Sequence, residues 1–335
     1  MSATLSAVAK ASGVSLATAS RAFSEPHRLS RETRANVVRA ARELGYRGGH
    51  ALPVGRTFAL IVPDIANPVI AALVKSIQER AWLGRHFMML GDSNEDPQRE
   101  RELVRYLAPQ VDGIIACSPR LEAGELLEYS GRLPLVLLNR DSAHTSAVLM
   151  DTSEGVRQAV EHLKALGHER IAYASGPSAS WSNERRYDAV VDACRAHGID
   201  LVTLGSSAAS VQGGLGVAAT VAACRATAVL AYNDLIALGI QSGLRSLNVD
   251  VPRDISVIGV DDLDLAAVSR PGLTSIGVPL ARIGARSLEV LLDQLGNPDY
   301  QRQTIQFGSQ LIVRESTAPR SSRPLGPLHT SNTGS

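Results

Sequence analysis

The sequence predicts a small all-helical domain at the N-terminus, joined to a larger α/β domain of two lobes with doubly wound parallel sheets. The length of 335 residues favours more than one domain. Three short helical patterns occupy residues 1–47, whereas apolar runs and helical patterns alternate from residue 58 onward. Charge divides the chain similarly: residues 1–57 hold nine Lys and Arg against three acids, a formal charge of +6, and the remainder carries −5. A basic head on an acidic body indicates a polyanionic partner for the head.

The composition argues against several classes of protein. The three cysteines, Cys117, Cys194 and Cys224, are too far apart for a metal-binding or disulfide motif. Residues 1–10 have no apolar run of signal-peptide length, and no segment reaches the ~20 apolar residues of a membrane span. We therefore expect a cytoplasmic protein with no membrane contact, no cofactor and no bound metal.

The first predicted helix begins near residue 5 and has one buried stripe. Leu5, Val8, Ala9 and Ser12 recur at helical spacing, and Gly13 supplies the tight turn that follows.

A second helix follows this turn at once. Ser15 is placed to cap it, because a Ser hydroxyl accepts a hydrogen bond from an N–H of the first helical turn. The side chains predicted to face inward are Ala19, Ala22 and Phe23, and those predicted to face outward are Leu16, Ala17, Ser20 and Arg21.

A third helix is capped by Ser30 and ended by Gly45. Its predicted apolar face consists of Val37, Ala40, Ala41 and Leu44. Two helices joined by a short glycine-containing turn are typical of the helix-turn-helix, whose second helix enters the major groove of DNA. A plain helical hairpin shares this pattern, but the charge of +6 and the small inward alanines, which permit close helix contact, favour DNA binding.

These segments resemble the lactose-repressor (LacI/GalR) family of bacterial transcriptional regulators. Residues 5–21, Leu-Ser-Ala-Val-Ala-Lys-Ala-Ser-Gly-Val-Ser-Leu-Ala-Thr-Ala-Ser-Arg, are similar to the opening of that family. Further similar segments are residues 29–34, 43–46, 62–68, 111–115, 166–172, 232–234, 251–262 and 313–317. The resemblance covers most of residues 4–318. It implies a sequence-specific DNA-binding regulator, with repression favoured, and a periplasmic-binding-protein-like effector domain.

In the resembled family the second helix of the DNA-binding domain reads base edges. The matching positions of this sequence are Ser15, Leu16, Ala17, Thr18, Ser20 and Arg21. Leu16 and Ala17 offer only apolar contacts, for example to thymine methyl groups, whereas Arg21 can pair with guanine or hold a phosphate. Thr18, Ser20 and the helix N-terminus are expected to anchor phosphates.

Residues 48–57 form the predicted linker. In the resembled family this segment makes a short hinge helix that inserts a leucine into the minor groove, which assigns that role to Leu52. The segment carries Gly48, Gly49 and Pro53, which oppose helix formation, so a flexible linker is the alternative.

Residues 58–318 form the predicted effector domain, and residues 319–335, rich in Ser, Pro, Gly and Thr, form a predicted disordered tail. The expected strands are residues 58–62, 86–90, 113–116, 135–138, 171–174, 201–204, 228–231 and 255–258. The expected helices are residues 68–83, 97–107, 122–130, 153–166, 184–197, 211–223 and 234–246. Because the alternation repeats after residue 151, we expect two lobes with a cleft between them.

Polar residues follow most of the predicted strands. They are Asp64, Asn67, Asp92, Ser118, Asn139 and Arg140 in the first lobe and Ser175, Asn233, Asp234, Asp261 and Asp262 in the second. Ligands of open parallel sheets bind at the carboxyl ends of strands, so these residues are candidates for the cleft. Carboxylates, amides and hydroxyls suit a polyhydroxylated ligand, whose hydroxyls both donate and accept hydrogen bonds. Capping of the next helix is the alternative role for each residue.

The resemblance narrows this set. Arg186, Asn233 and Asp261 occupy the positions of the family's effector-contacting Arg, Asn and Asp. The aliphatic residues 69–70 replace an aromatic pair found in many members, so Trp181 is the candidate for stacking, with a core position as its alternative role. The predicted effector residues are Asp64, Asn67, Asp92, Ser118, Arg140, Trp181, Arg186, Asn233 and Asp261.

Three partners are expected on this basis. They are double-stranded DNA carrying a palindromic operator, a second copy of the chain, and a small-molecule effector, for which a sugar is favoured over a nucleoside. A homodimer follows because one helix-turn-helix reads only a half-site. The effector is expected to reorient the lobes and thereby change DNA affinity, with release by ligand favoured over co-repression. No leucine heptad follows the effector domain, so no tetramerisation coil is expected.

Two other classes of protein compete with this interpretation. An enzyme could use Asp261, Asp262 and the glycine-rich residues 213–216, but no P-loop, complete dinucleotide-binding motif or nucleophile–base motif accompanies them. A ligand-binding protein without DNA function would leave the basic N-terminal segment unexplained.

Overall fold

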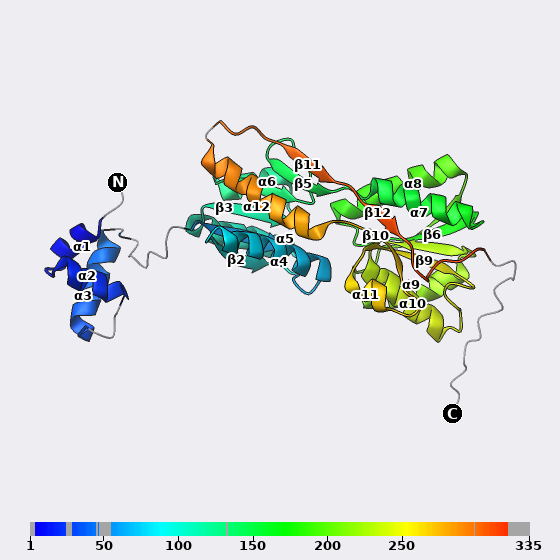
Figure 1. Cartoon of the computed structure of the whole chain (residues 1–335), viewed down its shortest axis with the longest axis horizontal. Helices are drawn as coiled ribbons and strands as arrows, with labels where there is room; N and C mark the ends of the chain where they lie inside the picture. Colours follow the sequence, from blue (N-terminus) through cyan, green and yellow to red (C-terminus); the bar gives the residue numbers. More distant parts are fainter. Residues whose placement is uncertain are drawn as a thin grey trace, which may run out of the picture. The chain divides into compact units, whose positions relative to one another are not determined.

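The computed structural model describes residues 4–24, 29–44, 46, 55–131, 133–297 and 299–320. Contacts divide the chain into two units, one with residues 1–56 and 84–86 and the other with residues 57–83 and 87–335 (Figure 1). In the described ranges, no helix is long and apolar enough to cross a membrane. Leu52 lies outside these ranges, as do residues 321–335 of the predicted tail.

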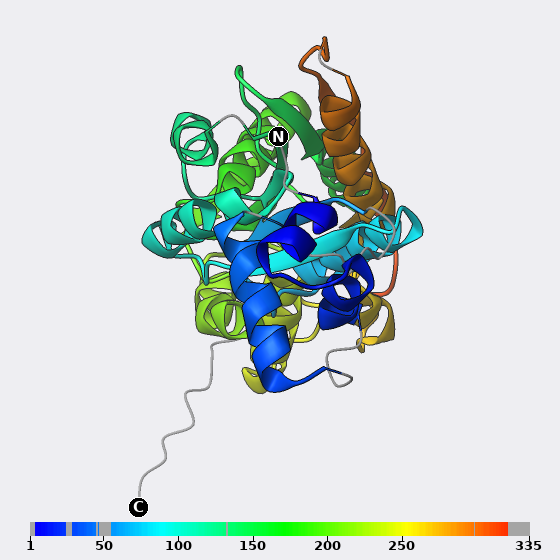
Figure 2. The ribbon, with the colours of Figure 1, turned by 90° about the vertical axis from the view of Figure 1, so that its left-hand side faces the viewer.

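The first unit consists of three helices in its described part (Figure 2). They pack around small apolar side chains such as Val8, Ala19 and Ala41. The helices are α1 (Leu5–Ala11), α2 (Leu16–Ser24) and α3 (Arg31–Glu43). The predicted caps are confirmed, because the hydroxyls of Ser15 and Ser30 each accept a hydrogen bond of 3.1 Å from the N–H three residues later. Gly13 has a φ of +67°, the left-handed conformation that its turn requires. Leu44, predicted on the apolar face of the third helix, is exposed, because α3 ends at Glu43.

The second unit contains two sheets, which we call the lobe-1 and lobe-2 sheets. The lobe-1 sheet has the order β11-β5-β4-β3-β1-β2 and the lobe-2 sheet the order β12-β10-β9-β8-β6-β7. The lobe-1 strands are β1 (Thr57–Val62), β2 (Phe87–Asp92), β3 (Gly113–Cys117), β4 (Leu135–Leu138), β5 (Ser146–Met150) and β11 (Thr304–Phe307). The lobe-2 strands are β6 (Arg170–Ala174), β7 (Asp200–Leu204), β8 (Ala228–Ala231), β9 (Ser256–Asp261), β10 (Thr274–Gly277) and β12 (Gln310–Ile312). All of these pairings are parallel except that of β12 with β10.

Helices cover both sheets, as expected for parallel strands. In lobe 1 they are α4 (Pro68–Leu83), α5 (Pro97–Leu107), the 3-10 helix η2 (Ala108–Gln110), α6 (Ala123–Ser130) and α12 (Leu280–Gly296). In lobe 2 they are α7 (Ser153–Ala165), α8 (Trp181–His197), α9 (Val211–Ala223), α10 (Asp234–Ser246) and α11 (Asp264–Val268). The predicted fold class, a helical N-terminal region followed by a two-lobed α/β domain, is confirmed.

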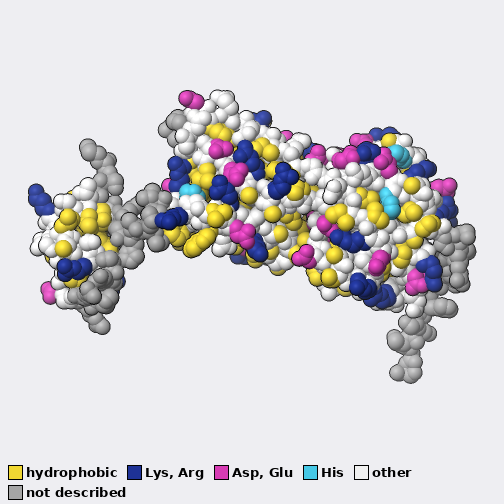
Figure 3. Space-filling view, in the orientation of Figure 1, with side chains coloured by type: hydrophobic (Ala, Val, Ile, Leu, Met, Phe, Trp, Pro, Cys, Tyr) yellow, Lys and Arg dark blue, Asp and Glu magenta, His cyan; other side chains and the backbone are white. Residues whose placement is uncertain are grey.

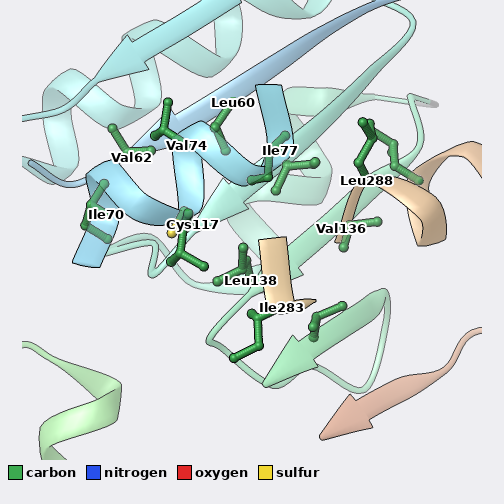
Figure 4. Packing of buried hydrophobic residues seen from close by; sticks show 14 of the residues in the cluster. Leu60, Val62, Ile70, Val74, Ile77, Cys117, Val136, Leu138, Ile283 and Leu288 are labelled. Atoms are coloured by element: carbon green, nitrogen blue, oxygen red, sulfur yellow. The ribbon is translucent and has the colours of Figure 1, made fainter. Parts of the chain in front are cut away.

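The core of lobe 1 lies between its sheet and the helices α4 and α12 (Figure 4). The side chains that fill it come from strands of the sheet and from both helices, and they include Leu60, Val62, Ile70, Val74, Ile77, Cys117, Val136, Leu138, Ile283 and Leu288. A second cluster covers the opposite face of the same sheet beneath α5 and α6. Both faces of the sheet are therefore buried, which explains the continuous apolar runs of its central strands.

The described chain passes between the two lobes three times. β5 of lobe 1 precedes α7 of lobe 2, β10 of lobe 2 precedes α12 of lobe 1, and β11 of lobe 1 precedes β12 of lobe 2 (Figure 1). Lobe 1 is thus completed by residues from near the C-terminal end of the chain. The sequence analysis predicted no helix or strand after residue 258, and it therefore did not predict that the chain returns to lobe 1.

Strand β2 differs from its prediction as a buried strand. It forms the edge of the lobe-1 sheet, and Phe87, Met89 and Leu90 are exposed. An apolar run is equally compatible with a buried strand and with an exposed edge, and only the position in the sheet decides between them.

The start of the predicted tail also differs. Arg320 is attached to lobe 2, because its N–H donates to the carbonyl of Leu166 at 2.8 Å and its guanidinium pairs with Glu169 at 2.6 Å.

Candidate functional site

A pocket lies between the lobes, at the carboxyl ends of strands from both sheets. It contains about 590 Å³ of space, part of it open to solvent. The polar side chains that line it are Asp64, Asn67, Glu95, Ser118, Arg120, Asn139, Ser180, Ser182, Arg186, Tyr232, Asn233 and Asp261. Strand ends of two sheets therefore bring together groups that are up to about 200 residues apart in the chain, as strand-end sites in parallel sheets do.

Most of the predicted effector residues line this pocket. They are Asp64, Asn67, Ser118, Arg186, Asn233 and Asp261.

The other three predicted residues, Asp92, Arg140 and Trp181, do not line it. The carboxylate of Asp92 accepts hydrogen bonds from the backbone N–H groups of Ile65 and Asn94. Arg140 pairs with Glu122 at 2.6 Å, and Trp181 lines a smaller neighbouring pocket.

Two asparagines both cap a helix and line the pocket. Asn67 Oδ1 accepts from the N–H of Val69 at 3.0 Å at the start of α4, and Asn233 Oδ1 accepts from the N–H of Ile236 at 2.9 Å at the start of α10. Capping uses only the amide oxygen, so Nδ2 of each residue can still donate to a ligand. The capping role and the ligand role are therefore compatible at these positions.

Arg186 and Asp261 are two ionisable residues of the lobe-2 wall. Arg186 is 7% exposed; its guanidinium lies over the ring of Tyr232, 4.7 Å from the centroid, and donates to the Tyr232 carbonyl and to Thr152 Oγ1. Burial raises the pKa of Asp261 well above its ordinary value, although the charge of Arg186 opposes this. Asp261 has a φ of 114°, a conformation that costs a residue with a side chain of order 1–3 kcal/mol. The fold thus holds this carboxyl at a strained position in the pocket wall.

A second carboxyl, that of Asp234, lies directly behind this wall. It is completely buried, and it accepts hydrogen bonds from Ser275 Oγ at 2.6 Å and from the N–H of Leu263 at 2.8 Å. Burial raises the pKa of Asp234 to about 7. Asp234 therefore titrates within the neutral range and fixes the backbone that follows β9.

The loop after β3 forms part of the lobe-1 wall. Glu100, buried on α5, accepts hydrogen bonds from the N–H groups of Arg120 at 2.8 Å and Leu121 at 3.2 Å, and burial raises its pKa. The Arg120 side chain in turn bonds the Ser118 carbonyl at 2.8 Å and the Glu95 carboxylate at 2.5 Å. This network places Ser118, Arg120 and Glu95 at the pocket.

Sequence reasoning missed several lining residues. Glu95, Arg120, Ser182 and Tyr232 were not predicted, and Asn139 was noted after its strand without being assigned to the site. Of these residues, Asn139 could have been predicted from its position after a strand, because it is the first residue after β4. Its φ of +58° is a conformation that Asn tolerates. The others depend on loops or on a neighbouring element and have no local signal.

The predicted DNA-reading face of α2 is exposed. Leu16, at 54% exposure, stands out because large apolar side chains are usually covered. Ala17, Ser20 and Arg21 are also exposed, whereas Ala19 is buried against the other helices.

Comparisons with known proteins match both units. The family model for bacterial regulatory proteins of the lacI family matches residues 4–48, and the model for a periplasmic binding protein-like domain matches residues 160–317. The HTH-type transcriptional repressor CytR of Escherichia coli strain K12 is 30% identical over 336 residues, which cover 94% of this chain and 96% of CytR. The chain belongs to the lacI family.

Solved structures of similar regulators agree with this membership. A LacI family regulator from Enterococcus faecium with bound ribose is 29% identical, covers 79% of this chain and 99% of its own, and superposes with a TM-score of 0.71. The regulator CelR in complex with cellobiose is 28% identical, covers 94% of this chain and 99% of its own, and has a TM-score of 0.72. As a lacI-family member, the chain is a DNA-binding transcriptional regulator rather than an enzyme.

Proposed function

We propose that this regulator is an operator-binding repressor whose affinity for DNA is controlled by a hydroxylated effector of the sugar class, bound in the pocket between the lobes. Residues 1–47 form the DNA-binding domain, residues 48–57 the linker and residues 58–318 the effector domain. Ser15, Leu16, Ala17, Thr18, Ser20 and Arg21 contact the operator, with Leu16 and Ala17 at base edges, Arg21 at a guanine or a phosphate, and Thr18 and Ser20 at phosphates. Leu52 is the minor-groove residue of the linker.

The observation that carries the proposal is the composition of the pocket wall. Asn67 and Asn233, whose Nδ2 atoms donate no hydrogen bond found among the described residues, line the same pocket as the carboxyl groups of Asp64 and Asp261 and the guanidinium of Arg186. Such mixed donors and acceptors match the hydroxyls of a sugar. The ribose and cellobiose bound to two similar regulators support the same class.

Control of DNA affinity requires the effector to bind one arrangement of the lobes better than another. Because the lining residues come from both lobes, a ligand here contacts both at once and has unequal affinity for different lobe arrangements.

Homodimer formation is supported by apolar side chains exposed along the β2 edge of lobe 1, where hydrophobic side chains are visible in Figure 3. We call Trp82, Leu83, Phe87, Leu90 and Tyr106 the β2-edge patch. Large apolar side chains exposed beside an unpaired sheet edge favour association between chains, and a dimer supplies two DNA-binding domains for a palindromic operator.

The first test is selection of bound duplexes from a random DNA pool by the purified full chain, with a variant lacking residues 1–47 in parallel. Enrichment of a palindrome by the full chain alone is expected. The selected duplex then serves as the probe for a panel of sugars and nucleosides, and a sugar that lowers operator affinity is the expected result. Absence of any selected sequence contradicts the DNA-binding part of the proposal, and a response to nucleosides alone contradicts the assigned effector class.

A further inference from the structure

The first turn of α8 lies between the lobes and presents two rows of side chains. Ser180 caps this helix, and its hydroxyl also bonds the Tyr232 hydroxyl at 3.1 Å. Residues four apart on a helix lie above one another, so Trp181 stands with Arg185 and Ser182 stands with Arg186. Because α8 belongs to lobe 2, both rows are carried by that lobe.

The Trp181 row contacts lobe 1. Trp181 packs against the lobe-1 cluster beneath α5 and α6, and the guanidinium of Arg185 lies 4.9 Å from the centre of its ring. Trp181 is partly buried by this contact, to which its ring offers a large apolar surface.

The Ser182 row forms a hydrogen bond across the cleft. Asn139 Nδ2 of lobe 1 donates to Ser182 Oγ at 2.7 Å and also lies 3.2 Å from Ser118 Oγ. Asn139 is 6% exposed, and its N–H donates to the Val148 carbonyl at 2.7 Å, so its position is fixed by its own lobe. Ser182 therefore docks on a preorganised partner.

This hydrogen bond separates two cavities. Asn139 and Ser182 line both the large pocket and a second space of about 300 Å³, which Trp181 also lines. On lobe 2, Leu235 and Leu263 make a further apolar contact with the lobe-1 core beneath α4 and α12.

We propose that Trp181 and the Asn139–Ser182 hydrogen bond form an interlobe latch that holds the lobes together through the chain's own side chains. Trp181 is then a wedge between the lobes rather than a platform on which the effector stacks. The latch sets the equilibrium between open and closed arrangements of the lobes, on which any effector acts. Ser182 is therefore a positioning residue, and its substitution should change this equilibrium in the absence of ligand. This inference does not depend on the identity of the effector or of the operator.

The latch can be tested on the full-length protein labelled with 5-fluorotryptophan, without added ligand. The chain has two tryptophans, Trp82 and Trp181, and the urea-unfolded protein supplies the reference value of an exposed ring. The measurement is the change of each ¹⁹F chemical shift between H2O and D2O, which grows with exposure of the ring to solvent. In the wild type, the solvent-isotope shift of Trp181 is expected to be much smaller than that of the unfolded protein.

Ser182→Ala removes the hydroxyl acceptor alone, and Asn139→Gly removes the donor while keeping the left-handed backbone, which glycine adopts freely. Each is expected to move the Trp181 solvent-isotope shift toward that of the unfolded protein. The double variant should add little, because both changes break the same bond. Ser182→Thr restores the hydroxyl and should restore the wild-type value. Ser207→Ala is the matched control, because that hydroxyl bonds the Ser175 carbonyl within lobe 2 at 2.8 Å and lines neither of the two spaces.

An unchanged Trp181 shift in Ser182→Ala and Asn139→Gly would overturn the proposal and leave the contact of Leu235 and Leu263 as sufficient to hold the lobes. An equal response of Ser207→Ala would also overturn it, since the effect would then be general loosening of the fold. An exposed Trp181 in the wild type would contradict the wedge directly.

Discussion

At the scale of single residues, several residues that line the pocket have polar atoms that take no part in the hydrogen bonds found among the described residues. Asn233 places its amide oxygen on the first turn of α10 and keeps Nδ2 for the cleft. Asp261 is held in a strained backbone conformation, beside Arg186, where no hydrogen bond to its carboxylate is found among the described residues. Groups with unused hydrogen-bonding capacity in a partly buried wall are what a polar ligand needs.

Asn233→Ser should separate the two roles of Asn233. Serine is as good an N-cap as asparagine, so the melting temperature should stay close to that of the wild type. The loss of the amide donor should weaken effector binding by about 1–2 kcal/mol, roughly a tenfold change in Kd. Calorimetric titration with the effector identified by operator release measures this, and unchanged affinity would remove Asn233 from the site.

Arg21→Ala should weaken binding to the selected operator by ~1–3 kcal/mol if Arg21 reads a guanine. Arg21 is exposed on α2, so the substitution should leave the fold unchanged. Binding to the operator and to a scrambled duplex is compared at one salt concentration. An equal loss on both would identify a phosphate contact instead.

Asp234 makes the stability of the protein depend on pH. Its pKa is about 7 in the folded protein but near 4 when unfolded, so between these values the native state binds more protons. The free energy of unfolding should therefore fall as pH rises from 4 to 7, in total by a few kcal/mol at about 1.4 kcal/mol per pKa unit.

Asp234→Asn should remove this dependence, so its stability relative to the wild type should rise between pH 5 and pH 8. Urea unfolding at a series of pH values measures the difference. His162 and His168 have pKa values lowered by burial and destabilise both proteins alike as pH falls, so their effect cancels in the comparison. A difference that stays constant with pH would contradict the assignment.

At the scale of elements, α9 and α10 explain the glycine-rich residues 213–216. These residues lie inside α9 rather than in a phosphate-binding loop. A Cβ on Gly214 would lie 2.2 Å from the Ile236 carbonyl oxygen, and one on Gly239 would lie 2.2 Å from the Val211 carbonyl oxygen. The two helices thus touch backbone to backbone, which only glycine permits.

Gly239→Ala should destabilise the protein by about 1–3 kcal/mol, because the backbone of α9 must move away. Gly216→Ala is the matched control in α9, where no atom lies within 4 Å of the added carbon. It should stabilise the helix by up to about 1 kcal/mol. Urea unfolding of both variants checks the prediction, and equal stabilities would show that the close approach is relaxed at no cost.

At the scale of the whole molecule, we expect dimer formation through the β2-edge patch to support DNA binding, because a dimer presents two DNA-binding domains to one operator. Leu90→Glu should be tolerated by the monomer, because this side chain is 44% exposed. A charge placed in a dimer interface should weaken association, and operator affinity with it, by about 2–5 kcal/mol. Sedimentation and operator titration measure both effects.

Lys164→Glu, an exposed charge change on α7, is the control and should alter neither quantity. A Leu90→Glu protein that remains dimeric would show that another surface joins the two copies.

Local sequence determined the elements, because caps and hydrophobic periods act over a few residues. Ser15 and Ser30 cap the helices they were predicted to cap, and α4, α5, α9 and α10 have the predicted bounds. The strand-end rule also brought Asp64, Ser118, Asn233 and Asp261 to one pocket, since parallel strands of a sheet end at the same edge.

Only the tertiary structure decided which sheet each late segment joins. The return of α12 and β11 to lobe 1, the edge position of β2 and the docking of Trp181 on the opposite lobe all depend on contacts between residues distant in the chain. A hydrophobic pattern predicts that one face of a helix or strand is buried, but it does not predict which element covers that face. For the same physical reason, the positions of Ser182 on α8 and of Arg120 after β3 in the pocket wall could be recognised only once the two lobes were placed together.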